Sequence, residues 1–255
     1  NDVLALKDAD CSIAMASGSD AASQAAQIVL MDSDFSKLPS VVYEGRRVVN
    51  NIQRSSSLFL VKNIFSLLLS ISTIVLLLDY PLTPSQISLI STFTIGIPAF
   101  LLALESNFDI IKGGFVRNVL YKALPGGLTD FLMVLAFMIY SQVFELNSED
   151  VSVVSTLLLA MVGFLILYKI SQPLNKIRAA VLISMIVAFI VCGIYMNDIF
   201  DIQAISSRTA MLLCIFTIAT ESVFRHITKL FEFFSRMAEK IRTRKNKNSE
   251  KTIGN

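Results

Sequence analysis

Two stretches of the sequence place oxygen-bearing side chains inside otherwise apolar sequence. Asn63 and Ser66 follow Lys62 in LVKNIFSLLLSISTIVLLL, and Ser91 and Thr94 lie in SLISTFTIGIPAF. Hydroxyl and amide oxygens are ligands that hard cations accept, although a site without carboxylates is usually weaker. The two stretches together predict a path for a cation, formed by Asn63, Ser66, Ser91 and Thr94 with Lys62 beside them.

The second stretch allows another interpretation. Gly96 and Pro98 weaken helical hydrogen bonding around residues 94–98, and Pro98 has no N–H to donate, so a carbonyl one turn earlier is left to bind an ion. The alternative is a simple proline kink whose hydroxyls bond to their own backbone. The polar residues of the first stretch favour the ion path.

Lys62 also has two interpretations. Its long side chain can extend toward the membrane surface and keep its ammonium in water. Alternatively, the ammonium is a fixed internal cation that pairs with an acidic group on a helix outside this chain. A buried Lys without a partner is costly or loses its charge, so either interpretation must provide water or a carboxylate.

The first stretch is part of a predicted long helix from Val42 to Leu78, which begins charged and becomes apolar. At 100° per residue, Asn63, Ser66, Ser70 and Thr73 share one narrow face of this helix. Unpaired polar groups are unfavourable in lipid, so this face is expected to meet other helices or a wet cavity.

The composition predicts a polytopic membrane protein. Hydrophobic residues make up 54% of the 255 residues and charged residues only 16%, which excludes an ordinary soluble domain. A bilayer needs roughly 20 apolar residues per helix. Six apolar runs are long enough, near Leu58–Leu78, Ile87–Leu104, Leu128–Phe144, Val151–Tyr168, Ala179–Met196 and Thr209–Val223.

Loop charges predict the orientation of these spans. Lys and Arg concentrate after the second, fourth and sixth spans, which by the positive-inside rule places these loops and both termini in the cytoplasm. Asp79, Asp130 and Glu221 are expected at span ends within reach of water, so no carboxylate is central in any span. Cys11, Cys192 and Cys214 form no metal spacing and are expected to be buried, inert thiols.

The first forty residues alternate short helix and strand signals, an α/β pattern. Forty residues bury too little surface for a stable sheet domain, so this segment is expected to be the end of a larger one.

The motifs NDVLALKDADCSIAM, GSDAASQAAQIVLMDSDFSKL and EGRRVVNNIQR, followed by six spans, resemble the C-terminal part of P-type cation-transporting ATPases. The resemblance implies a mainly α fold, with a six-helix transmembrane bundle preceded by the end of an α/β phosphorylation domain of the haloacid-dehalogenase type. It divides the chain into residues 1–40 of that domain, a stalk at 41–57, transmembrane helices five to ten at 58–224 and a basic cytoplasmic tail at 225–255.

The resemblance also implies roles for individual residues. Asn1 and Asp2 match the last two residues of a motif that shapes the phosphate and magnesium pocket. Asn63 matches a fifth-helix Asn that ligates the cation, and Thr94 matches a Thr of the ligand region. Lys62 before this Asn is similar to the proton–potassium pumps of the family.

Other positions depart from the family pattern. Ser66 stands where calcium and sodium pumps carry Glu, Ser91 where they carry Asn or Asp, and Ile95 where they carry Asp. These departures argue against a two-calcium site of the animal type. The pattern TFTIGIP resembles a bacterial group proposed to move calcium or related divalent cations, which ranks calcium before other divalent or proton-coupled monovalent ions.

The resemblance implies ATP and Mg²⁺ as cofactors of the complete protein, in a bacterial plasma membrane. Its partners are the lipid bilayer, the transported cation and upstream pump domains, with no nucleic acid. The Asp-Lys-Thr-Gly phosphorylation motif does not occur in the sequence. This chain alone is therefore expected to be inactive, as the C-terminal part of a longer pump. The alternatives are a non-catalytic accessory membrane protein and a secondary carrier, although a carrier should show paired broken helices in two halves.

Overall fold

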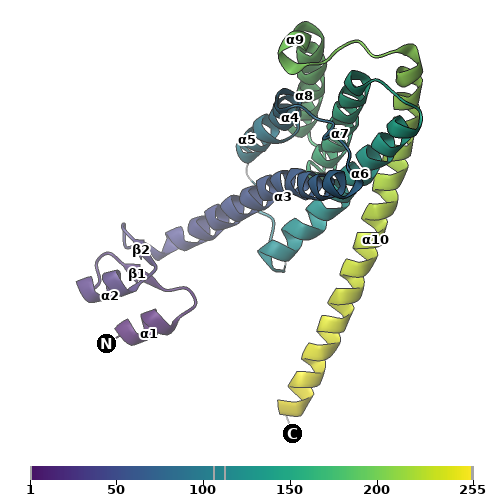
Figure 1. Ribbon diagram of the computed structural model, residues 1–255. Coiled ribbons are helices and arrows are strands. Elements are labelled where there is room, and N and C mark those ends of the chain that lie inside the picture. Colours follow the sequence, from purple (N-terminus) through teal and green to yellow (C-terminus); the bar gives the residue numbers. More distant parts are fainter. Residues whose placement is uncertain (1, 106, 112, 254–255) are drawn as a thin grey trace. The chain divides into compact units, whose positions relative to one another are not determined.

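The computed structural model describes residues 2–105, 107–111 and 113–253, and it is mainly helical (Figure 1). The chain divides into two compact units. The first comprises residues 1–50 and 107–111, and the second comprises residues 51–106 and 112–255. The predicted long helix is confirmed as α3, Leu38–Leu76, whose residues contribute to both units.

The first unit contains the predicted helix, strand, helix and strand. They are α1 (Val3–Asp8), β1 (Ile13–Met15), α2 (Asp20–Ala25) and β2 (Ile28–Leu30), followed by the short helix η1 (Phe35–Lys37). β1 and β2 are parallel, with Ala14 opposite Val29, and α2 forms the crossover that a parallel pair requires. The Ser19 side chain caps α2 by accepting a hydrogen bond from the N–H of Ala22. The described part of this unit thus holds a two-stranded sheet.

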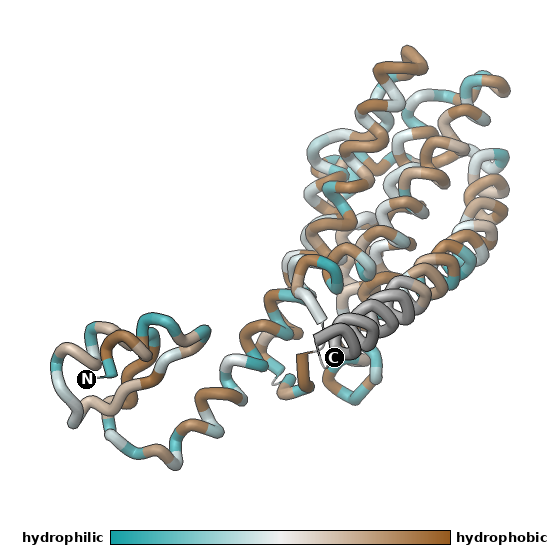
Figure 2. The backbone as a smooth tube through the Cα atoms, turned by 90° about the horizontal axis from the view of Figure 1, so that it is seen from below, coloured by the Kyte–Doolittle hydropathy of each residue, from teal (hydrophilic) through white to brown (hydrophobic). Residues whose placement is uncertain are grey.

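The second unit is a bundle of helices joined by short connections. Its elements after α3 are α4 (Pro84–Ser91), the π-helix η2 (Thr92–Gly96), α5 (Ile97–Ala103), α6 (Phe115–Val143), α7 (Ser148–Ile170), α8 (Lys176–Tyr195), α9 (Asn197–Phe200) and α10 (Ser207–Ile253). Figure 2 shows hydrophobic residues along most of the length of these long helices.

Six helical segments of the described chain are long and apolar enough to cross a membrane, as the sequence predicts. The first of them begins at Phe35 instead of Leu58, because it is continuous with the charged half of the long helix. The third begins at Phe115 instead of Leu128, because Pro125 lies inside α6 without ending it. The prediction of three buried cysteines is wrong, since Cys11 and Cys214 are exposed and Cys192 is only partly covered.

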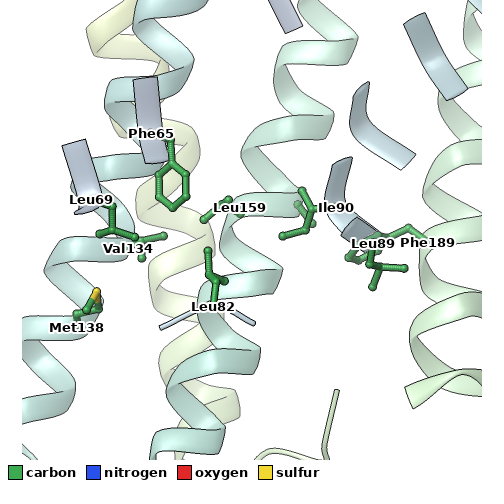
Figure 3. Packing of buried hydrophobic residues seen from close by; sticks show 10 residues of the cluster. Phe65, Leu69, Leu82, Leu89, Ile90, Val134, Met138, Leu159 and Phe189 are labelled. Atoms are coloured by element: carbon green, nitrogen blue, oxygen red, sulfur yellow. The ribbon is translucent and has the colours of Figure 1, made fainter. Parts of the chain in front are cut away.

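The main apolar cluster of the bundle joins residues of α3, α4, α6, α7 and α8 with Leu82 of a loop. Figure 3 shows its packing. Phe65 and Leu69 of α3 pack with Val134 of α6, Leu159 of α7 and Leu89 of α4. All five side chains are nearly or completely buried. Because lipid tails are as apolar as Leu, close packing of side chains contributes more to helix association here than removal from water does.

Two glycines let α6 approach its neighbours closely. A Cβ on Gly127 would lie 2.8 Å from the Ile64 Cβ and 3.0 Å from the carbonyl oxygen of Val61, both on α3. A Cβ on Gly126 would lie 2.3 Å from the Cδ1 of Ile166 on α7. A larger residue at Gly127 therefore forces α6 away from α3, and one at Gly126 displaces the Ile166 side chain.

Gly127→Ala is expected to destabilise the protein by about 1–3 kcal/mol, the usual cost of overpacking. Gly45→Ala is the matched control, because an added Cβ there meets nothing within 4 Å and helix propensity favours Ala by roughly 0.5–1 kcal/mol. Thermal unfolding in detergent measures both changes. Equal unfolding temperatures for Gly127→Ala and the wild type would contradict the close packing of α6 on α3.

Candidate cation site between the membrane helices

A cavity of about 80 Å³ lies between α3, α4, η2, α6 and α7. Its volume is enough for an ion and a few water molecules. Most of its wall is apolar, from residues such as Phe65, Ile90 and Ile95. Its polar lining consists of Lys62, Ser66, Tyr80, Ser91, Thr94 and Asp130.

The structure brings four of the five predicted cation-path residues to this cavity. Lys62 and Ser66 stand one turn apart on α3, while Ser91 ends α4 and Thr94 lies in η2. The cavity wall on α3 repeats at helical spacing, through residues 58, 61, 62, 65 and 66. The two polar stretches of the sequence therefore meet at one site.

Asn63 does not line this cavity. It is exposed and lines a separate hollow with Ser55, Ser56 and Phe59 of α3 and Val119 of α6. A turn of about 100° per residue separates its side chain from that of Lys62, which moves it to the adjacent face of the helix. The shared polar face expected for Asn63 and Ser66 thus divides between two hollows.

The hydroxyls of Ser91 and Thr94 donate hydrogen bonds to backbone carbonyls of their own helix. Ser91 Oγ donates to the carbonyl of Ile87 at 2.6 Å, and Thr94 Oγ1 donates to the carbonyl of Ile90 at 2.7 Å. The alternative prediction, that these hydroxyls bond to their own backbone, is therefore correct. It is compatible with an ion site, because a hydroxyl that has donated its proton still offers oxygen lone pairs.

The backbone between Ser91 and Pro98 is wound as a π-helix instead of being broken. The N–H of Ile97 bonds to the carbonyl of Thr92, five residues earlier. Pro98 has no N–H for the carbonyls of Phe93 or Thr94, five and four residues before it. Single π turns inside α-helices occur frequently at functional sites, since they present backbone and side chains irregularly.

Asp130 is the cavity residue that sequence reasoning missed. The prediction that it lies at a span end within reach of water is wrong, as is the prediction that no carboxylate is central in a span. Asp130 lies midway along α6 and is 4% exposed. Its Oδ1 has no hydrogen-bond partner among the described residues. The predicted third span begins at Leu128, which puts Asp130 at its end, whereas α6 begins at Phe115.

Close packing of α7 fixes the position of Thr94. A Cβ on Gly163 of α7 would lie 2.8 Å from Thr94 Cγ2 and 3.1 Å from Thr94 Oγ1. Gly163 also lines the cavity. A larger side chain at this position would therefore displace the Thr94 hydroxyl.

Side chains of α3 hold the end of α5, the helix that continues from η2. Arg54 donates to the carbonyl of Leu102 at 3.1 Å, and Asn51 Nδ2 donates to the carbonyl of Ala103 at 3.0 Å. The last carbonyls of a helix lack intrahelical donors, and these two side chains supply them. The same helix that provides Lys62 and Ser66 thus anchors the segment that provides Thr94.

An ion pair just beyond α5 joins this end to α8. Arg178 Nε donates to Glu105 Oε2 at 2.6 Å, and Asn175 also donates to the Glu105 carboxylate. Burial raises the pKa of Glu105, but the hydrogen bonds from Arg178 and Asn175 and the positive charges of Arg178 and Arg54 outweigh it and lower the pKa overall. The ion pair therefore favours the charged carboxylate.

Comparison with known proteins identifies relatives of the chain. No family model matches it. It is 32% identical over 86% of its length to the probable cation-transporting ATPase exp7 of Streptococcus pneumoniae. It is 50% identical over half of its length to the calcium-transporting ATPase CtpE of Mycolicibacterium smegmatis, and 31% identical over 63% to a calcium-transporting ATPase of Bacillus subtilis.

The chain is related to the P-type cation-transporting ATPases. The resemblance stated from its motifs is thereby confirmed, and with six membrane helices it is an integral membrane protein. The chain spans between 17% and 30% of the length of these three relatives.

The magnesium and phosphate pocket implied by P-type ATPases is not built by the described residues. Asn1 lies outside them, and Asp2 is an exposed residue before α1 whose side chain makes no capping hydrogen bond. Residues 2–105, 107–111 and 113–253 contain no group of three or more His, Cys, Asp or Glu side chains that could bind a metal ion. Asp2 alone supplies one exposed carboxylate to such a pocket, so no step is assigned to Mg²⁺ or ATP here.

Glu105→Gln is expected to lower stability at neutral pH by about 2 kcal/mol, because it removes a charge-assisted hydrogen bond. The folded-state pKa of Glu105 lies below its usual value of 4.5, so its contribution is present above pH 4.5 and is lost as the pH falls through the lowered pKa. The difference in unfolding temperature between the wild type and Glu105→Gln should therefore shrink on acidification. A difference that is constant with pH would contradict the ion pair.

Proposed function

We propose that this chain is the C-terminal transport portion of an ATP-driven P-type cation pump. The complete pump moves a cation through an aspartyl-phosphate cycle, and the phosphorylated Asp belongs to a part of the protein outside this chain. The observation that carries the proposal is the cavity between membrane-spanning helices where Lys62 and Ser66 meet Ser91 and Thr94. Oxygen ligands enclosed at membrane depth suit a transported cation.

Calcium is the first candidate for the transported ion. Two of the relatives described above are named calcium-transporting ATPases, and a third is named a probable cation-transporting ATPase. Another divalent ion or a proton-coupled monovalent ion is the second candidate. Asn63 stays in the proposed path as a residue of the adjacent hollow, one position along α3 from Lys62.

The proposed division of labour follows the order of the chain. Residues 1–40 form the end of the haloacid-dehalogenase-like phosphorylation domain, residues 41–57 form the stalk, residues 58–224 form the transport helices, and residues 225–255 form a cytoplasmic tail. ATP and Mg²⁺ act in the complete protein. Because α3 is continuous from Leu38 to Leu76, it can transmit motion from the catalytic part to the Lys62–Ser66 turn.

The proposed orientation rests on the basic loops. Residues 112–122 and 169–178 and both termini face the cytoplasm, in a bacterial plasma membrane. Motion of the stalk would then reach the cavity from the cytoplasmic side.

ATP-dependent uptake of radioactive Ca²⁺ into inside-out vesicles that contain the complete protein tests this function. Thr94→Ala should raise the half-activating Ca²⁺ concentration at least about tenfold, because it removes an oxygen from the cavity. Thr92→Ala is the matched control: Thr92 makes the same bond to its own helix, at 2.8 Å to the carbonyl of Ser88, but is exposed and does not line the cavity.

Two results would contradict the proposal. Vesicles with the complete protein that form no phosphoenzyme from labelled ATP would favour the accessory protein or the secondary carrier. Equal effects of the Thr94 and Thr92 substitutions on the half-activating Ca²⁺ concentration would show that the cavity does not bind the transported ion.

A further inference from the structure

The two charged side chains that line the cavity are Lys62 of α3 and Asp130 of α6. Neither takes part in the ion pairs formed within the described part of the chain. Asp130 is 4% exposed, and its Oδ1 has no partner among the described residues. Lys62 is only partly buried. The cavity thus holds one acidic and one basic group among hydroxyls.

A carboxylate that keeps its charge in this position requires a positive partner. Removing an ion from water costs several kcal/mol, and a buried charge is retained in proteins when it is paired or bound to a metal. Two positive partners are available to Asp130 in this cavity, and in the structure the Lys62 Nζ lies more than 4.0 Å from its carboxylate oxygens. One is the ammonium of Lys62, on a flexible four-carbon stem, and the other is a cation that enters the cavity.

The neutral oxygens around the cavity are suited to a cation. Ser91 and Thr94 direct their hydroxyl protons toward the carbonyls of Ile87 and Ile90, which leaves lone pairs on their oxygens. Ser66 adds a third hydroxyl from α3. One carboxylate with several neutral oxygens is the ligand set of a hard cation.

We propose that Asp130 is the charged ligand of the cation in this cavity, and that Lys62 is its internal counter-charge, which pairs with the carboxylate whenever the cation is absent. The inference rests on the proposed function and deepens it, because it names the acidic ligand and the group that the cation displaces. The glycines at 126 and 127 position Asp130, since they seat the preceding turn of α6 against α3 and α7.

The proposal sets opposite effects for the two side chains. Removing the charge of Asp130 removes a ligand and weakens cation binding. Removing the charge of Lys62 removes a competitor and strengthens cation binding. A purely structural role for either residue would instead weaken binding in both variants or change neither.

The test is the rise in unfolding temperature of the complete protein in detergent as Ca²⁺, Mn²⁺, Mg²⁺ or K⁺ is titrated without ATP. The midpoint is the ion concentration that gives half of the maximal rise. Asp130→Asn should raise this midpoint at least about tenfold, whereas Lys62→Met should lower it by a similar factor, because the charge of the ligand set tunes affinity. In the double variant, loss of Lys62 should partly restore the stability that Asp130→Asn loses without ions.

Matched controls remove the same charges elsewhere. Asp198→Asn and Lys176→Met replace exposed residues that do not line the cavity, and both should leave the midpoint unchanged. Three results would each overturn the proposal. They are an unchanged midpoint in Asp130→Asn, an unchanged or raised midpoint in Lys62→Met, and a wild-type protein that none of the four ions stabilises. Should Asp130→Asn fail to fold, Lys62→Met against the wild type decides alone.

This measurement is independent of the pump cycle. If the opposite midpoint shifts occur but ATP-dependent uptake is absent, the cation site stands and the proposed pump fails. If uptake occurs but the midpoints do not shift in opposite directions, the pump stands and the roles of Asp130 and Lys62 fail.

Discussion

Polar groups inside a bilayer must find partners within the protein, and this constraint organises the helices of the second unit. Ser91 and Thr94 return their hydroxyl protons to carbonyls one turn earlier. Arg54 and Asn51 of α3 serve the final carbonyls of α5. Five buried side-chain atoms of the described chain depart from this pattern, and the Oδ1 of Asp130 is the one among them that belongs to a carboxylate. An exception of this kind is costly, so a specific partner has to be found for it.

The second requirement of the bundle is that its helices approach one another closely. Lipid gives little hydrophobic drive for helix association, so close packing has to hold the helices together. Glycine removes the side chain at two contacts that shape the cavity. Gly127 brings α6 against Val61, next to Lys62 on α3, and Gly163 brings α7 against Thr94. These contacts place the carboxylate, the ammonium and the hydroxyls around one space although they come from separate helices. The same glycine contacts therefore determine both the packing of the helices and the geometry of the site.

Much of this arrangement follows from the sequence, and the rest depends on facts that a single sequence does not carry. Apolar length predicts six spans, and helical spacing brings Lys62 and Ser66 to one face. Asn63 and Ser66 line different hollows, because a helix interior to a bundle has neighbours on several faces and periodicity does not say which neighbour each face meets. Asp130 is misplaced because the apolar run that defines the third span begins at Leu128, whereas the helix begins at Phe115 and keeps Pro125 in its interior.

Pairing of Lys62 with Asp130 sets a threshold that an entering ion must exceed. In the proposed pair, opposite charges brought to about 4 Å would attract by roughly 4 kcal/mol at an effective dielectric constant of about 20. A tethered ammonium also has a high local concentration, because its short stem keeps it at the cavity. A dilute ion displaces it only by making contacts that the ammonium does not make. An ammonium offers three donors, whereas a calcium-sized ion gathers roughly six to eight oxygens at once. The hydroxyl oxygens of Ser66, Ser91 and Thr94 supply part of that difference, so coordination number as well as charge selects the ion over the lysine.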